Sequence, residues 1–248
     1  MRRRLLGPLL LLAGMACSDA QDQEPFGELS RLALGRTDKA MDVHGFTELY
    51  EHLFYPLKDD SIRICEIGVA YGGSLTMWRD YFPKAEVYGI DIFDFDLSHL
   101  DTARIHTFIA DQADRDDLRS FIEAHGREGF DIILDDGGHR MDQQQVSLGY
   151  LFKSVKPGGY YVIEDVHTSL ADRYKDFGVS EDSTDTTLIM INEFLRSGQI
   201  KSQYLSAEEN RYLMDQIEYC LLFVRNSLAH SMAAVFKKKQ PAETSAGK

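Results

Sequence analysis

Acidic side chains and a histidine follow two neighbouring apolar segments, and together they could support metal-assisted removal of a proton. The segment 135–139 reads Asp-Asp-Gly-Gly-His, and Glu164 and Asp165 end the next apolar segment. Mg²⁺ binds carboxylate oxygens and keeps waters that substrate hydroxyls can replace. Asp136, Glu164 and Asp165 are therefore the candidate metal ligands, since so many acids at adjacent strand ends would repel one another without a cation. The alternative is that these acids are separate helix caps and surface ion pairs.

His139 is the candidate general base of this group. An imidazole has an unperturbed pKa of about 6.5, so a large part of it can accept a proton at neutral pH. A bound cation would also acidify a substrate hydroxyl. The alternative roles for His139 are a helix cap or a support for another pocket residue, and His167 is a weaker candidate for the same pocket.

A glycine-rich turn precedes these residues and indicates a ligand that approaches the backbone closely. Residues 64–74 read Ile-Cys-Glu-Ile-Gly-Val-Ala-Tyr-Gly-Gly-Ser. Dinucleotide folds and methyl-donor folds both use such a turn, but an acid at the strand end repels a pyrophosphate and suits an ammonium or a ribose. Asp91 follows after about twenty residues, the separation expected for an acid that binds ribose hydroxyls, and Asp111 and Gln112 could face an adenine. The candidate cofactor-binding residues are Glu66, Gly68, Tyr71, Gly72, Ser74, Asp91, Ile92, Asp111, Gln112 and Asp135.

Alternating strands and helices position these residues. Strands are expected at 62–67, 86–92, 105–110, 130–134 and 160–164. Helices are expected at 45–55, 74–82 with Ser74 as N-cap, 113–125, 141–155 and 184–196. This alternation predicts an α/β fold with a mostly parallel sheet and helices on both faces. The runs 217–224 and 232–236 read as a C-terminal antiparallel hairpin at the sheet edge.

The composition narrows the possible partners. A formal net charge of −13 disfavours nucleic acids and anionic membrane surfaces, because phosphate binding needs basic patches. The three cysteines offer no disulfide framework and no zinc spacing. We expect one domain at 21–236 and a disordered polar tail at 237–248.

The first twenty residues resemble a secretory signal. Three arginines precede an apolar run at 5–16, and small residues follow it. The run is too short for a stable membrane span. An upstream extension without a targeting role is equally compatible with this pattern, so the localisation stays open.

The acidic strand end followed by Gly-x-Ala-x-Gly resembles motif I of class I S-adenosylmethionine (SAM) methyltransferases, which have a Rossmann-like fold. Further segments resemble the metal-dependent sugar O-methyltransferases of antibiotic pathways, of the mycinamicin and tylosin type. The resemblance covers residues of about 30–170 and rests on 35–39 (Gly-Arg-Thr-Asp-Lys), 44–47 (His-Gly-Phe-Thr), 66–74, 78–83 (Trp-Arg-Asp-Tyr-Phe-Pro), 135–139, 157–159 and 164–165.

This resemblance implies methyl transfer from SAM to a sugar hydroxyl with Mg²⁺, a histidine base and a small-molecule acceptor. It implies Asp136, Glu164 and Asp165 as metal ligands and His139 as the base, with residues 37–39 and His44 helping to close the pocket. The sequence departs from the family pattern at Phe46, where a tyrosine is expected, and at Glu164, where members can carry aspartate.

Three other functions remain open at this point. A catechol-type metal-dependent O-methyltransferase would also bind a vicinal diol. The second is a nicotinamide-dependent oxidoreductase, which the acid before the glycine-rich turn argues against. The third is a catalytically silent SAM-binding or secreted protein, which the leader favours, whereas SAM chemistry favours the cytoplasm. A homo-oligomer is possible.

Overall fold

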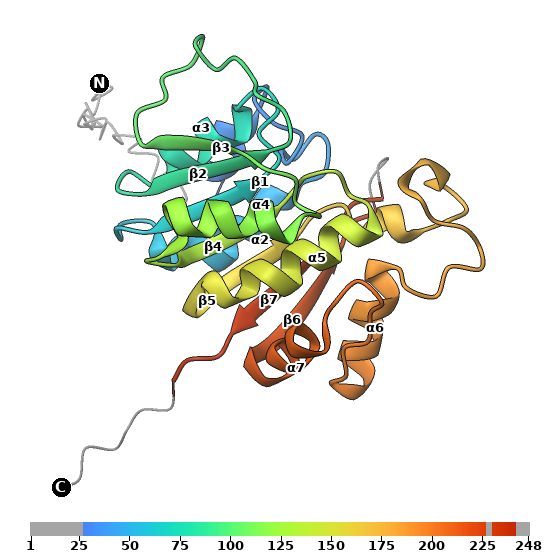
Figure 1. Cartoon of the computed structure of the whole chain (residues 1–248). Helices are drawn as coiled ribbons and strands as arrows, with labels where there is room; N and C mark the ends of the chain where they lie inside the picture. The colour runs from blue at the N-terminus through green and yellow to red at the C-terminus, as the bar shows by residue number, and fades with distance from the viewer. Residues whose placement is uncertain (1–26, 227–229, 242–248) are drawn as a thin grey trace, which may run out of the picture.

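A seven-stranded sheet forms the centre of the protein. The computed structural model describes residues 27–226 and 230–241, and the strand order is β3-β2-β1-β4-β5-β7-β6 (Figure 1). The first five strands run parallel, while β7 is antiparallel to both β5 and β6. The strands are β1 (Arg63–Ile67), β2 (Glu86–Asp91), β3 (Ile105–Ile109), β4 (Phe130–Asp135), β5 (Val155–Ile163), β6 (Ile217–Val224) and β7 (Met232–Lys238).

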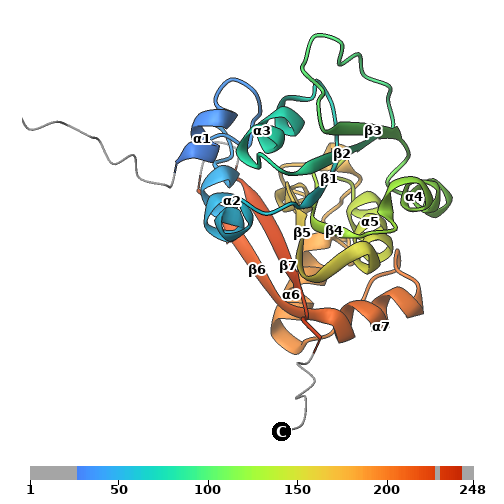
Figure 2. The ribbon, with the colours of Figure 1, turned by 90° about the vertical axis from the view of Figure 1, so that its left-hand side faces the viewer.

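Helices cover both faces of this sheet and enclose two apolar cores. With the sheet turned toward its edge, one helical layer is seen on either side of it (Figure 2). One core takes its side chains from α1 (Glu28–Ala33), α2 (Phe46–Phe54) and α3 (Gly73–Tyr81). The other uses α4 (Arg115–Phe121), α5 (Met141–Leu151), α6 (Thr187–Ser197) and α7 (Ala207–Gln216).

The predicted architecture is confirmed: a mostly parallel sheet, helices on both faces and a C-terminal antiparallel hairpin. Three local predictions were wrong. Residues 156–159, which were expected to form a turn between the helix at 141–155 and the strand at 160–164, lie within β5. Helix α3 begins at Gly73 with Gly72 as its N-cap, in place of Ser74. Lys237 and Lys238, expected in the tail, belong to β7, where Lys238 Nζ donates to three buried or partly buried backbone carbonyls.

The leader at 1–20 and residues 242–248 lie outside the described residues. The signal-like leader and the disordered end of the tail therefore remain predictions. In the part of the chain that is described, we find no helix with the length and apolar character needed to cross a bilayer.

Gly68 allows the ends of β1 and β4 to approach each other closely. Its φ angle is +97°, and a Cβ atom there would lie 2.1 Å from the carbonyl oxygen of Asp136. Gly68→Ala should therefore cost about 2–4 kcal/mol of unfolding free energy, measured by urea denaturation, because strain and a backbone clash add.

Gly35→Ala is the matched control for this prediction. Gly35 also has a positive φ of +70°, but nothing lies within 4 Å of its added Cβ. Gly35→Ala should lose only about 1–2 kcal/mol of unfolding free energy, which is the cost of the left-handed backbone conformation for alanine. Equal losses in the two variants would contradict the close approach at Gly68.

Candidate functional site

The alternation of side chains along three parallel strands brings three carboxylates to one side of the sheet. Ile64, Leu134 and Val162 point into the core under α1 to α3. Successive strand residues alternate between faces, so the residue two positions later faces the same side. Those residues are Glu66, Asp136 and Glu164.

All three carboxylates converge on the ammonium group of Lys39, which comes from the loop between α1 and α2. Lys39 is fully buried. Its Nζ atom lies 3.1 Å from Glu66 Oε1 and 3.1 Å from Glu164 Oε2, and it also donates to Asp136 Oδ2. Burial alone would lower the pKa of Lys39, but the charges of Asp136, Glu164 and Glu66 together raise it well above its usual value. The lysine is therefore a permanent cation inside the acidic cluster.

A second group of ligand atoms lies beside this cluster. Side-chain atoms of Asp136, His139 and Asp165 all lie within 4.8 Å of one another. His139 Nε2 is 3.6 Å from Asp165 Oδ2, and both residues have positive φ angles, of 57° and 53°. His44 and His167 approach the same aspartate, with Nδ1 to Oδ1 distances of 3.8 and 3.7 Å. The three predicted metal ligands therefore divide between two groups that share Asp136.

Burial shifts the titration of these groups. It raises the pKa of Glu164 well above its usual value, with Lys39 opposing the shift. Burial also raises the pKa of Asp165, against the charge of His139. Burial, followed by positive charge on neighbouring histidines, lowers the pKa of His167 to about 4, so this ring is neutral at neutral pH. A cation close to a buried carboxylate stabilises its charged form and opposes the rise in pKa that burial causes.

The donor set fits a hard divalent cation. Glu164 Oε1 and Asp165 Oδ1 are buried and have no hydrogen-bond partner among the described residues. Asp136, Glu164 and Asp165 offer only oxygen atoms, the ligand type that Mg²⁺ prefers. Lys39 uses the other oxygen of Glu164, so one oxygen of this residue stays available to a cation.

A cavity of about 560 Å³ lies above the carboxyl ends of the central strands. The glycine-rich turn forms one wall, and Asp91 organises it by accepting backbone hydrogen bonds from Val69 (2.8 Å), Ala70 (3.3 Å) and Phe93 (3.0 Å). Asp136 and His139 line the same cavity. The position agrees with the rule that open α/β sheets bind ligands at the carboxyl ends of their strands.

Most of the predicted cofactor-binding residues line this cavity. They are Gly68, Tyr71, Ser74, Asp91, Ile92, Asp111 and Gln112. Gln112 is only 5% exposed, and its amide joins Asp135 Oδ1 to the backbone N–H of Gly138.

Glu66, Gly72 and Asp135 are not among the residues that line this cavity, and their direct contact with a cofactor stays a prediction. Glu66 is buried because its strand position points it at Lys39 and Trp78, whose Nε1 donates to Glu66 Oε2 at 3.1 Å. Asp135 points to the opposite face, where it accepts from Gln112 and from Ser147 on α5. Gly72 serves as the N-cap of α3.

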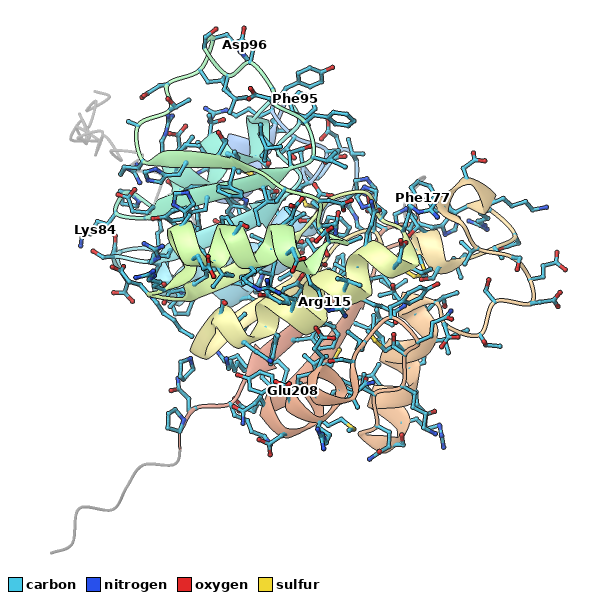
Figure 3. The ribbon with its side chains drawn as sticks, in the orientation of Figure 1. Lys84, Phe95, Asp96, Arg115, Phe177 and Glu208 are labelled. Carbon is cyan, nitrogen blue, oxygen red and sulfur yellow. The ribbon has the colours of Figure 1, made fainter. Side chains whose placement is uncertain are left out.

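Two segments extend away from the sheet beside the site, and no pattern in the sequence predicted their place there. Figure 3 labels Phe95, on the loop after β2, and Phe177, on the segment after β5. Phe95 lines the cavity, and the Phe177 ring lies 6.1 Å from the His139 ring. Residues 36–38 complete the wall. The sequence resemblance implied this role for 37–39 and His44, of which Lys39 and His44 are not among the lining residues.

Comparisons with known proteins identify relatives of this chain. No protein-family model matches it. A tetracenomycin-C rhamnosyl 3'-O-methyltransferase of Streptomyces olivaceus is 39% identical over 177 residues, which cover 68% of this chain and 44% of that protein. The mycinamicin VI 2''-O-methyltransferase of Micromonospora griseorubida is 35% identical over 182 residues, covering 71% and 44%. The chain is homologous to sugar O-methyltransferases.

A solved structure supports the same relationship. The MycE methyltransferase of the mycinamycin pathway, in complex with Mg, SAH and mycinamycin VI, superposes with a TM-score of 0.70 and 31% identity. The match covers 89% of this chain and 57% of that one. The chain thus shares the Rossmann-like methyltransferase fold and spans about half the length of the relatives it matches.

Proposed function

We propose that the protein is a SAM-dependent O-methyltransferase that acts on a sugar hydroxyl of a glycosylated small molecule. One observation carries this proposal: the turn that resembles the SAM motif and the acid–histidine group line one cavity. A methyl donor bound along Gly68 and Asp91 would thus lie next to Asp136 and His139. The homologues are sugar O-methyltransferases, which favours a sugar acceptor over a catechol.

His139 would accept the proton of the acceptor hydroxyl. Its Nε2 lies 3.6 Å from Asp165 Oδ2, beside the candidate metal ligands, whereas its Nδ1 is buried. Because a base must reach the hydroxyl whose proton it takes, the accepting atom would be Nε2 and not the buried Nδ1. The deprotonated acceptor oxygen would attack the methyl carbon, and the carbon–sulfur bond would break to leave a neutral thioether.

Asp136, Glu164 and Asp165 would hold Mg²⁺ or another divalent cation, which when bound lowers the pKa of a hydroxyl group. SAM would supply an already activated methyl group. The residues of this chain would then mainly orient the two reactants and remove one proton.

Calorimetric titration of SAM and of NAD into the full chain, with and without Mg²⁺, tests the donor assignment. We expect saturable binding of SAM and none of NAD. Binding of NAD alone would overturn the proposal in favour of an oxidoreductase. Screening of glycosylated compounds against catechols, with Mg²⁺ present, then tests the acceptor class.

Asp91→Ala should weaken SAM binding about 10- to 100-fold. The carboxylate orders the turn through three backbone N–H groups, and hydrogen bonds to a charged group contribute about 1.5–3 kcal/mol. Asp94→Ala is the matched control, because Asp94 is exposed on the same loop and does not line the cavity. Equal SAM affinity in the two variants would contradict the role of Asp91.

The remaining partner assignments follow from charge and from the proposed chemistry. The net charge of −13 supports a protein that does not bind nucleic acid, and a filter-binding assay would test this.

Use of SAM supports a cytoplasmic site of action despite the signal-like leader. N-terminal sequencing of the expressed protein would show whether Met1 is retained. A homo-oligomer stays a proposal that light scattering can test.

A further inference from the structure

Lys39 connects two parts of the site that are distant in sequence. It lies on the loop between α1 and α2, directly after residues 36–38, which line the cavity. Its partners Asp136 and Glu164 follow 97 and 125 residues later. The contact therefore fastens the cavity-lining loop to two of the candidate metal ligands.

The individual atoms show that Lys39 and a cation would use different oxygens. Lys39 contacts Oδ2 of Asp136 and Oε2 of Glu164, whereas Oε1 of Glu164 is buried without a hydrogen-bond partner in the described residues. Glu66 holds the ammonium from the inner side through Oε1, and its second oxygen is occupied by Trp78. The lysine can therefore stay in place when a cation binds.

The charge balance explains why a lysine is buried there. Glu66 and Glu164 are at most 1% exposed, and Asp136 is next to both. Without an internal cation these carboxylates would face one another in a low-dielectric interior, where an unpaired charge is costly. One ammonium lies among three acidic side chains, and Oε1 of Glu164 is left over for a second cation.

We propose that Lys39 is a positioning residue: its buried ammonium assembles Asp136 and Glu164 before a cation binds and latches residues 36–38 onto the cavity. The part of this inference that concerns the cation rests on the proposed function. The assembly of the carboxylates, and the latch by which the Lys39 contacts hold residues 36–38 beside the cavity, rest on these contacts alone.

Thermal unfolding of Lys39→Met, in EDTA and in Mg²⁺, is the first test. We expect a lower Tm in EDTA, because the carboxylates lose their internal counter-charge, and a smaller Mg²⁺-dependent rise in Tm than in the wild type, because ligands that are not assembled in advance bind the cation more weakly. Backbone amides of residues 36–39 should exchange hydrogen faster in this variant. Lys238→Met is the matched control: Lys238 is also a buried lysine, but its ammonium donates to backbone carbonyls away from the site. Its loss should lower Tm equally in EDTA and in Mg²⁺ and leave exchange at residues 36–39 unchanged.

A double-mutant cycle with Glu66→Gln, measured in EDTA, separates the latch from the metal assignment. Glu66→Gln should restore part of the Tm lost in Lys39→Met, because it removes the charge that the lysine neutralised. If Lys39→Met alone does not fold, folding of Lys39→Arg or of the double variant supports the proposal, and failure of both overturns it.

If the Tm losses of Lys39→Met and Glu66→Gln simply add in the double variant, and the amide hydrogen exchange of residues 36–39 is unchanged in Lys39→Met, the proposal is also overturned. If Mg²⁺ changes neither the wild-type Tm nor that of Lys39→Met, the metal assignment fails, while the cycle in EDTA still decides the role of Lys39.

Discussion

His139→Gln should lower kcat by about 10²- to 10⁴-fold and leave SAM affinity close to that of the wild type, as expected for loss of a general base. His139 lines the cavity beside Asp136, and its Nε2 lies 3.6 Å from Asp165 Oδ2, among the candidate metal ligands. Glutamine keeps similar size and polarity but cannot accept the proton in the same way. Single-turnover kinetics with a reactive acceptor, together with SAM calorimetry, measure the two quantities separately.

His106→Gln is the control for this experiment. His106 lies on β3, where its Nε2 is 2.7 Å from Glu86 on the neighbouring strand, and it does not line the cavity. It should leave turnover unchanged. Unchanged turnover in His139→Gln would reject the base assignment, and equal losses of kcat and SAM affinity would indicate a binding role.

Asp165→Asn should weaken binding of a divalent cation by more than about 100-fold, the upper end of the losses seen for outer-shell partners of metal sites. Asp165 Oδ1 is buried without a hydrogen-bond partner in the described chain, and three histidines surround the carboxylate. An amide in its place removes the negative charge and one oxygen ligand. Calorimetry with Mg²⁺ and Mn²⁺ measures the affinity, and methyl transfer should fall with it.

Asp142→Asn controls for the loss of an acidic charge near the site. Asp142 lies at the start of α5, where its exposed carboxylate is 3.5 Å from Arg140 Nε. Asp142→Asn should keep the cation affinity and turnover of the wild type.

Chelation of the wild type should abolish turnover, and Mg²⁺ should restore it. Full activity after chelation would show that the carboxylates do not hold a catalytic cation.

The parallel strands were predictable from sequence because each one is an apolar run that ends in polar residues. β1, β2 and β4 begin and end within one residue of their expected limits. The cavity-lining positions of Asp91 and His139 followed from the same reasoning, since carboxyl ends of parallel strands share one edge. The candidate metal ligands were chosen by residue type, and the sequence did not show that they divide between two groups.

The role of Lys39 could not be found from local sequence, because its partners Asp136 and Glu164 lie 97 and 125 residues away and a polar loop is normally solvated. A signal for the cluster did exist: Glu66, Asp136 and Glu164 all lie two positions after a core residue of the α1–α3 side. The same alternation separates Asp135 from Asp136. Helix α7 was also missed, although its capping box of Ser206 and Glu209 was visible in the sequence.

The order of strands at the C-terminal edge has a consequence for synthesis on the ribosome. Strand β7 is made last, yet it lies between β5 and β6, and in the described sheet it is the neighbour that β6 pairs with. Until β7 has been translated, β6 cannot join the sheet and β5 has a bare edge. Nascent chains that stall before residue 232 would therefore expose a strand edge that invites pairing with other chains.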